Sequence, residues 1–279
     1  MARPRPFQSA ETAVPAPGAV SGPVPDLSPY ETASVPVAGI AVDYPAGSRI
    51  PPHCHGRAQL LYAVKGVLTV TAGNGRWIVP PHRGVWLCAG AEHAVETRGA
   101  AQMRSLFIDP RAVADLPAEN GVISISPLLR ELIVAATRLP LDYRPDSRAG
   151  RLMHCLLDEL AAVPRLPFYL PWPNDPRIAG VCTMLIEAPD APATAEAWAR
   201  QLATSSKTFH RRFLDATGVP FGRWRQHARL LHSLEDLAQG LPVLEVAFRH
   251  GYDNQSAYAA AFKRQFGMPP SRFYRTETA

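Results

Sequence analysis

The sequence has few cysteines and no long apolar run, and each shortage excludes a class of protein. The cysteines among its 279 residues are Cys54, Cys88, Cys155 and Cys182, which show no paired spacing. We therefore expect reduced thiols in a cytoplasmic protein rather than a disulfide framework. No run of about 18 apolar residues occurs, so no membrane span is expected. Arg3 and Arg5 are not followed by an apolar segment, so no signal peptide is expected.

The residues that are present indicate a folded, basic protein. Apolar residues make up 47% of the chain, which is enough for hydrophobic cores in the two domains that this length allows. The net charge of +5 fits a polyanionic partner. From Arg177 onward there are 13 lysines and arginines against 9 aspartates and glutamates, so most of the basic excess lies in the C-terminal part.

The C-terminal part contains two copies of one helical pattern, AEAWARQLATSSKTFHRRFLDATG and PVLEVAFRHGYDNQSAYAAAFKRQFG. Each copy begins with a short apolar helix and a tight turn. A polar residue suited to capping the next helix follows, Ser205 in one copy and Asn254 in the other. A longer helix then ends at a glycine, Gly218 or Gly267, which suits the left-handed position after a helix. The matching order predicts two helix-turn-helix units.

The longer helices have two different faces. Phe209 and Phe213 lie four residues apart, as do Tyr258 and Phe262, so each pair packs inward on one face. The other faces carry donors for base edges or phosphates in a major groove, although an ordinary bundle with a solvated face is the alternative. Including basic residues nearby, the candidate DNA contacts are Ser206, Lys207, His210, Arg211, Arg223, Arg225, Asn254, Gln255, Ser256, Lys263 and Arg272.

These stretches and the closing GMPPSRFYR resemble the DNA-binding domain of AraC-type transcription regulators. The resemblance implies two helix-turn-helix subdomains joined by one long helix over residues 220–239. Ala203 departs from the family because it replaces the usual turn glycine. Ala259 and Ala260 also stand where many relatives carry larger polar side chains, so the second helix is expected to read bases weakly.

The basic residues divide into two expected roles. Specificity is expected mainly from His210 and Arg211, with Lys207 flanking, because arginine pairs strongly with guanine. Arg223, Arg225, Lys263 and Arg272 are expected to anchor phosphates, which gives affinity without base choice. Arg211→Ala should therefore relax base choice, whereas Arg225→Ala should weaken binding to all sequences alike.

Residues 35–108 change to short β-branched and aromatic runs separated by turn signals, a pattern typical of a small barrel or jelly roll. The alternating runs on either side of Ala72-Gly-Asn-Gly75 predict a hairpin with one buried face. The motifs PPHCHGRAQLLYAVKG and VPPHRGVWLCAGAEHAVE resemble the cupin barrel that precedes many AraC-type DNA-binding domains. That resemblance implies a sensor or dimerisation domain, not a catalyst.

Three histidines form a candidate pocket in this barrel. His53 and His55 alternate along a strand and so project to one side, and His93 follows a turn that brings it near them. Three imidazoles suit a divalent transition metal. Gln59, a weaker neutral ligand, stands where metal-binding cupins usually have a carboxylate. Three interpretations stay open: a metal site, a pocket for an organic effector, and purely structural histidines.

Helical spacing returns in residues 126–163. Ser126 and Pro127 predict a helix start, and two leucine stripes follow, Leu128, Leu132, Ala135 and Leu139, then Leu152, Leu156, Leu157 and Leu160. They resemble the helical pair that dimerises AraC-type sensors, although packing on their own barrel is the alternative. The next segment, PRLPFYLPWPNDP, predicts a semi-rigid linker that Phe168, Tyr169 and Trp172 pin to one domain.

Together these features predict an α+β protein of two domains, a cupin-like β-barrel with a C-terminal helical pair and an all-α tandem helix-turn-helix domain. The expected segments are a disordered tail (1–30), the barrel (31–110), a helical dimerisation or packing segment (111–163), the linker (164–176) and the DNA-binding domain (177–279). The expected function is sequence-specific transcription regulation controlled by a small-molecule or metal effector. The alternatives are a cupin metalloenzyme fused to a DNA-binding module and a non-specific nucleic-acid binder. Expected partners are promoter DNA, a second copy of the chain and RNA polymerase.

Overall fold

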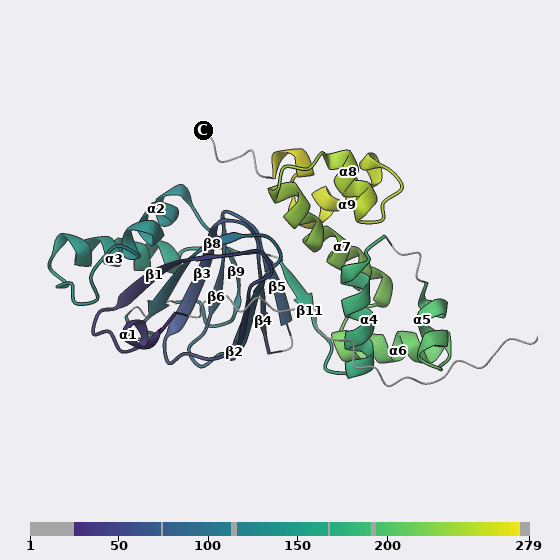
Figure 1. Ribbon diagram of the computed structural model, residues 1–279, viewed down its shortest axis with the longest axis horizontal. Helices are drawn as coiled ribbons and strands as arrows, with labels where there is room; N and C mark the ends of the chain where they lie inside the picture. Colours follow the sequence, from purple (N-terminus) through teal and green to yellow (C-terminus); the bar gives the residue numbers. More distant parts are fainter. Residues whose placement is uncertain (1–24, 74, 113–115, 167, 191–193, 274–279) are drawn as a thin grey trace, which may run out of the picture.

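The computed structural model describes residues 25–73, 75–112, 116–166, 168–190 and 194–273. A β-sandwich forms the N-terminal domain and a group of helices forms the C-terminal domain (Figure 1). This is the α+β, two-domain organisation that the sequence predicts. None of the helices in these ranges is long and apolar enough to cross a membrane.

The N-terminal domain consists of two antiparallel sheets. One has the strand order β1-β8-β3-β6-β9-β10 and the other has the order β11-β5-β4-β7-β2, so the described strands form a jelly-roll-like sandwich rather than one closed barrel. The predicted hairpin is confirmed, since Leu68 pairs with Val79 and Val70 pairs with Trp77. The strands are β1 (Val37–Tyr44), β2 (Arg49–His53), β3 (Ala58–Lys65), β4 (Leu68–Ala72), β5 (Gly75–Val79), β6 (Arg83–Leu87), β7 (His93–Thr97), β8 (Ala101–Ile108), β9 (Gly121–Ser124), β10 (Arg165–Leu166) and β11 (Tyr169–Pro171).

Two helices, α2 (Pro127–Ala136) and α3 (Arg148–Ala161), cover the six-stranded sheet. Ser126 caps α2 as predicted, because its side chain accepts a hydrogen bond from the Leu129 amide. The predicted apolar stripe of α2 is wrong, because the helix is rotated about its axis relative to that prediction. Leu128 is 50% exposed, and the buried face consists of Leu129, Leu132, Ile133 and Ala136. The buried leucines of α3 also face this core. The pair thus packs on its own sheet, and a homodimer stays a prediction.

The expected disorder of residues 1–30 is wrong for residues 25–30. Residues 1–24 lie outside the described residues, whereas residues 25–30 enter the fold and include most of helix α1 (Ser28–Glu31). Leu27 and Tyr30 pack against the hydrophobic cluster of the six-stranded sheet. Composition suggested disorder because few large apolar residues occur here, but these two find partners on strands distant in sequence.

The proline-rich segment is part of the structure of both domains. β10 pairs with β9 and β11 pairs with β5, so this segment extends both sheets. Phe168 is buried and its ring stacks on Phe266 of the C-terminal domain, with centroids 5.3 Å apart. Trp224 donates an indole hydrogen bond of 2.7 Å to the Pro171 carbonyl. The segment therefore fastens the domains together instead of spacing them apart.

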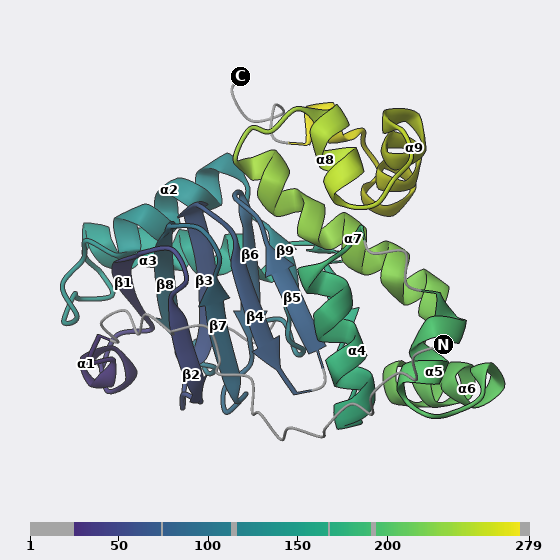
Figure 2. The ribbon, with the colours of Figure 1, turned by 45° about the vertical axis from the view of Figure 1, so that its right-hand side comes forward.

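The C-terminal domain has the predicted helix order. Its long central helix joins two helical pairs, and Figure 2 shows these pairs at opposite ends of that helix. The elements are α4 (Pro176–Glu187), α5 (Ala195–Gln201), α6 (Ser206–Thr217), α7 (Phe221–Ala238), α8 (Val243–Arg249), α9 (Gln255–Phe266) and the short 3-10 helix η1 (Pro270–Arg272).

Candidate nucleic-acid interface and metal centre

The first helical pair, α5 and α6, holds its longer helix by a cap and a buried aromatic face. The Ser205 side chain accepts a hydrogen bond from the Thr208 amide at 3.2 Å. Phe209 and Phe213 are fully buried, as the spacing predicts. Gly218 ends α6 in the left-handed conformation with a φ of 72°. Local sequence therefore fixes where α6 begins, which face it buries and where it ends.

The outer face of α6 is basic and does not pack against the hydrophobic core. Lys207, His210 and Arg211 are exposed, and their spacing places them side by side on the helix. Ser206 is half-buried and donates a hydrogen bond to the Glu196 carboxylate at 3.5 Å, so it is the least available of the expected contacts. Arg212, which the sequence analysis did not single out, is also exposed.

The second pair, α8 and α9, repeats this construction with a different surface. The Asn254 side chain accepts a 2.8 Å hydrogen bond from the Ala257 amide, and Tyr258 and Phe262 are fully buried. The exposed side chains along α9 are smaller and less charged than those of α6, apart from a basic pair at its C-terminal end. They are Gln255, Ser256, Ala257, Ala260, Lys263 and Arg264, with Ala259 half-buried.

Helix α7 sets the separation of the two pairs. Its 18 residues make it about 27 Å long at about 1.5 Å per residue. That length is close to the repeat of about 34 Å between successive major-groove turns on one side of a DNA duplex. Among the expected phosphate contacts, Arg223 and Arg272 are exposed, whereas Arg225 is half-buried. Burial, together with the nearby Arg229, lowers the pKa of the Arg225 guanidinium.

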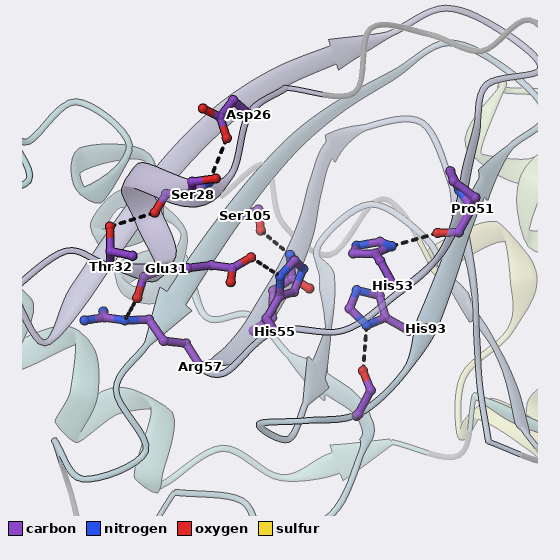
Figure 3. Close-up of polar contacts among 12 residues, drawn as sticks. Asp26, Ser28, Glu31, Thr32, Pro51, His53, His55, Arg57, His93 and Ser105 are labelled. Atoms are coloured by element: carbon purple, nitrogen blue, oxygen red, sulfur yellow. Dashed lines mark hydrogen bonds and ion pairs between the residues drawn. The ribbon is translucent and has the colours of Figure 1, made fainter.

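The three predicted histidines come together in the N-terminal domain (Figure 3). One ring nitrogen from each of His53, His55 and His93 lies within 4.8 Å of the others. His53 ends β2 and pairs with His93 at the start of β7, whereas His55 lies two residues beyond the strand. Nitrogens about 2.1 Å from a zinc ion lie at most about 4.2 Å apart, so a shared ion requires a small inward movement.

Backbone oxygens fix the protonation pattern of two of these rings. His53 Nδ1 is 2.7 Å from the Pro51 carbonyl oxygen, and His93 Nδ1 is 2.9 Å from the Ala91 carbonyl oxygen. A carbonyl oxygen can only accept, so each Nδ1 donates and each neutral ring keeps its lone pair on Nε2. The His93 Nε2 is buried and has no hydrogen-bond partner among the described residues, which leaves its lone pair available to a cation.

The third ring is oriented by a carboxylate that the sequence analysis missed. Glu31 Oε1 in α1 accepts a 2.7 Å hydrogen bond from His55 Nδ1, and the buried His55 Nε2 has no partner in the part of the chain that the structure describes. Gln59, expected in the carboxylate's place, donates instead from Nε2 to Ser105 Oγ at 2.9 Å. No local pattern marks Glu31, because it lies 24 residues before His55.

Burial keeps two of the rings neutral. It lowers the pKa of His93 from 6.5 to about 4, and it also lowers the pKa of His55, where the hydrogen bond to Glu31 opposes the shift. Both rings are therefore neutral at pH 7, as a metal ligand must be.

The space beside the histidines is small. A cavity of about 20 Å³ is lined by His53, Gln59 and His93 together with apolar side chains of both sheets. Pro25 and Leu27 of the N-terminal segment line the same cavity. About 10–15 Å³ is enough for one water molecule, so this space suits an ion or a water molecule rather than an organic ligand.

Each of the two domains matches a known protein family. Residues 34–166 match the model of the AraC-like ligand binding domain, and residues 198–276 match that of a helix-turn-helix domain. A ligand-binding sandwich joined to paired helix-turn-helix units defines a DNA-binding transcription regulator. The chain belongs to the AraC-type family of these regulators.

Two curated relatives illustrate the similarity. The chain is 33% identical over 251 residues to the HTH-type transcriptional regulator NimR of Escherichia coli K12, covering 89% of this chain and 92% of NimR. It is 30% identical over 129 residues to the regulator RipA of Corynebacterium diphtheriae, covering 46% of this chain and 36% of RipA. Both relatives are regulators, and membership of the AraC-type family favours a transcription regulator over the cupin metalloenzyme alternative.

Two solved structures are also similar to the chain. ToxT from Vibrio cholerae has a TM-score of 0.38 at 9% identity, with 88% of this chain and all of ToxT (100%) covered. The DNA-binding domain of AdpA in complex with a target DNA has a TM-score of 0.34 at 28% identity, covering 37% of this chain and 98% of that domain.

Proposed function

We propose that the protein is a sequence-specific regulator whose effector is a divalent transition-metal ion held by His53, His55 and His93. The observation that carries the proposal is the hydrogen-bond pattern that the three rings share. Each Nδ1 has an oxygen partner, whereas the buried Nε2 atoms of His55 and His93 have none within the described ranges. Three neutral imidazoles favour borderline ions such as Zn²⁺, Ni²⁺ or Fe²⁺.

The proposed DNA readout rests on the difference between the exposed helices. Lys207, His210 and Arg211 give α6 long donors suited to guanine and phosphate, and α9 contributes Gln255 and Ser256. Arg223, Lys263 and Arg272 would anchor phosphates on either side. A non-specific binder would not need this asymmetry, and competition between a promoter fragment and random DNA at fixed salt tests the point.

The metal proposal is tested on protein purified without a histidine tag. Bound Zn, Ni and Fe are measured by elemental analysis, and affinities are then measured by titration. We expect one equivalent per chain in the wild type and its loss in His93→Ala. His154→Ala is the matched control, because His154 is an exposed histidine on α3 outside the cluster.

Promoter affinity measured with and without the ion tests the effector role. An effector must bind one domain arrangement better than another, so the ion should change affinity for promoter DNA in the wild type and not in His93→Ala. Metal binding without that change would make the ion structural. Failure to bind any of the ions, with His93→Ala behaving as wild type, would contradict the metal proposal and favour an organic effector.

A further inference from the structure

We propose that Glu31 is the positioning residue of the metal site, and that metal binding and the docking of residues 25–36 onto the sandwich stabilise each other. This inference rests on the proposed metal function of the three histidines. His53 and His93 are oriented by backbone carbonyls only two residues away. His55 is oriented by a charged side chain on a separate helix, so its orientation depends on a tertiary contact.

The contact has the geometry of a carboxylate–histidine–metal triad. Glu31 binds the Nδ1 edge of the ring, which leaves Nε2 on the opposite edge for the ion (Figure 3). The His55 side chain is 4% exposed and that of Glu31 is 34% exposed, so the hydrogen bond is shielded from water on the histidine side. A carboxylate in this position fixes the ring and raises the basicity of the ligating nitrogen.

The segment that carries Glu31 is held at the same place. Helix α1 has four residues, too few to be stable alone. Arg57, two residues after His55, donates to the carbonyl oxygens of Glu31, Ala33 and Val35. One side chain therefore ties three carbonyl groups of the segment to the residue that precedes strand β3.

Apolar contacts join the segment to the same histidine. The Tyr30 ring lies 6.1 Å from that of Phe107, and Phe107 lies 5.0 Å from His55 in an edge-on contact. Pro25 and Leu27 line the cavity beside the cluster. Residues 25–36 thus cover the metal site and depend on its surroundings for their packing.

These contacts imply that metal binding and the docking of residues 25–36 stabilise each other. An ion on Nε2 withdraws electron density from the ring, so Nδ1–H becomes a stronger donor to Glu31. The ion therefore stabilises the docked segment, and by thermodynamic linkage the docked segment increases affinity for the ion by the same factor. Loss of such a second partner typically weakens metal binding by about 10–100-fold.

The test compares Glu31→Gln with Asp26→Asn. Both variants remove one negative charge from the same segment, but the Asp26 carboxylate accepts a hydrogen bond from the Ser28 amide, and among the described residues its contacts include no histidine. Affinity is measured with Co²⁺ through its visible absorption bands, and thermal unfolding checks that each variant is folded. Hydrogen exchange of residues 25–36 is measured with and without Co²⁺.

We expect Glu31→Gln to raise the Co²⁺ dissociation constant by about tenfold or more and to abolish the metal-dependent protection of residues 25–36. Asp26→Asn should keep both properties. An unchanged constant in Glu31→Gln, with binding lost in His93→Ala, would overturn the role of Glu31 and leave the metal function standing. An equal loss in Asp26→Asn would overturn it too. If the wild type binds no ion, both proposals fail.

Discussion

The first helix-turn-helix unit, α5 with α6, and the second, α8 with α9, share a buried skeleton and present different surfaces. Each longer helix begins at a side-chain cap, buries two aromatic residues four positions apart, and ends at a glycine with positive φ. Outside that skeleton α6 carries four exposed cationic or imidazole side chains, Lys207, His210, Arg211 and Arg212, whereas α9 carries mostly smaller ones ahead of a basic pair at its C-terminal end. Packing thus constrains the inner positions of both units and leaves the outer positions to recognition.

The turns of the two units also differ. Ala203 adopts a φ of 51° at the place where the second unit has Gly251, with a φ of 71°. The same backbone hydrogen bond follows each residue, from Thr204 to the Ala199 carbonyl and from Tyr252 to the Ala247 carbonyl, both at 2.9 Å. The turn geometry is therefore common to both units, but only the second has the residue best suited to it.

The buried skeleton gives the largest expected effect. Phe213→Ala and Phe262→Ala should each lower the free energy of unfolding of the C-terminal domain by about 3–5 kcal/mol, because each removes a fully buried ring. Denaturant unfolding followed by helical circular dichroism measures both. A loss confined to one variant would show that the two units are not equivalent in packing.

The outer faces give the next effect. Arg211→Ala should lower discrimination between promoter and random DNA by about 1–3 kcal/mol, because arginine reads guanine through two hydrogen bonds. Gln255→Ala on α9 should cost less. Arg223→Ala should weaken binding to both DNAs alike, and it tests phosphate anchoring more cleanly than Arg225→Ala because Arg225 is half-buried. Equal losses on both DNAs for Arg211→Ala would contradict this division.

Substitutions in the turns of the two units should have opposite signs. Ala203→Gly should raise stability by up to about 1 kcal/mol because it relieves a positive φ. Gly251→Ala should lower stability by about 1–3 kcal/mol. A Cβ there would lie 2.5 Å from the Arg229 guanidinium, which hydrogen bonds to the Pro189 and Gly251 carbonyls. Thermal unfolding measures both, and a shift of the same sign in the two variants would refute the argument.

The features that short-range sequence patterns specify were predicted correctly. Caps at Ser126, Ser205 and Asn254 follow from residues close together in the chain. The convergence of His93 with His53 and His55 was expected from the two cupin-like motifs that carry these histidines. Features that depend on distant partners were missed or placed wrongly. Glu31 reaches His55 across 24 residues, and no composition signal marks that contact.

Local sequence patterns also failed to predict the strands at the sheet edges and the buried face of α2. The proline-rich segment was expected to act as a linker, yet two short pieces of it add a strand to each sheet. The α2 stripe was misplaced because Leu128 and Leu129 are both apolar, and only the position of the sheet decides which one is buried. Such choices are made by tertiary packing rather than by local sequence.

The central claim is that α6 and α9 enter successive major-groove turns on one side of a duplex. Hydroxyl-radical footprinting of the purified protein on its own promoter tests this most directly. We expect two protected segments about 10 bp apart on one face of the DNA, with the α6 segment losing its sequence preference in Arg211→Ala. A single short protected segment, or two segments on opposite faces, would contradict the account.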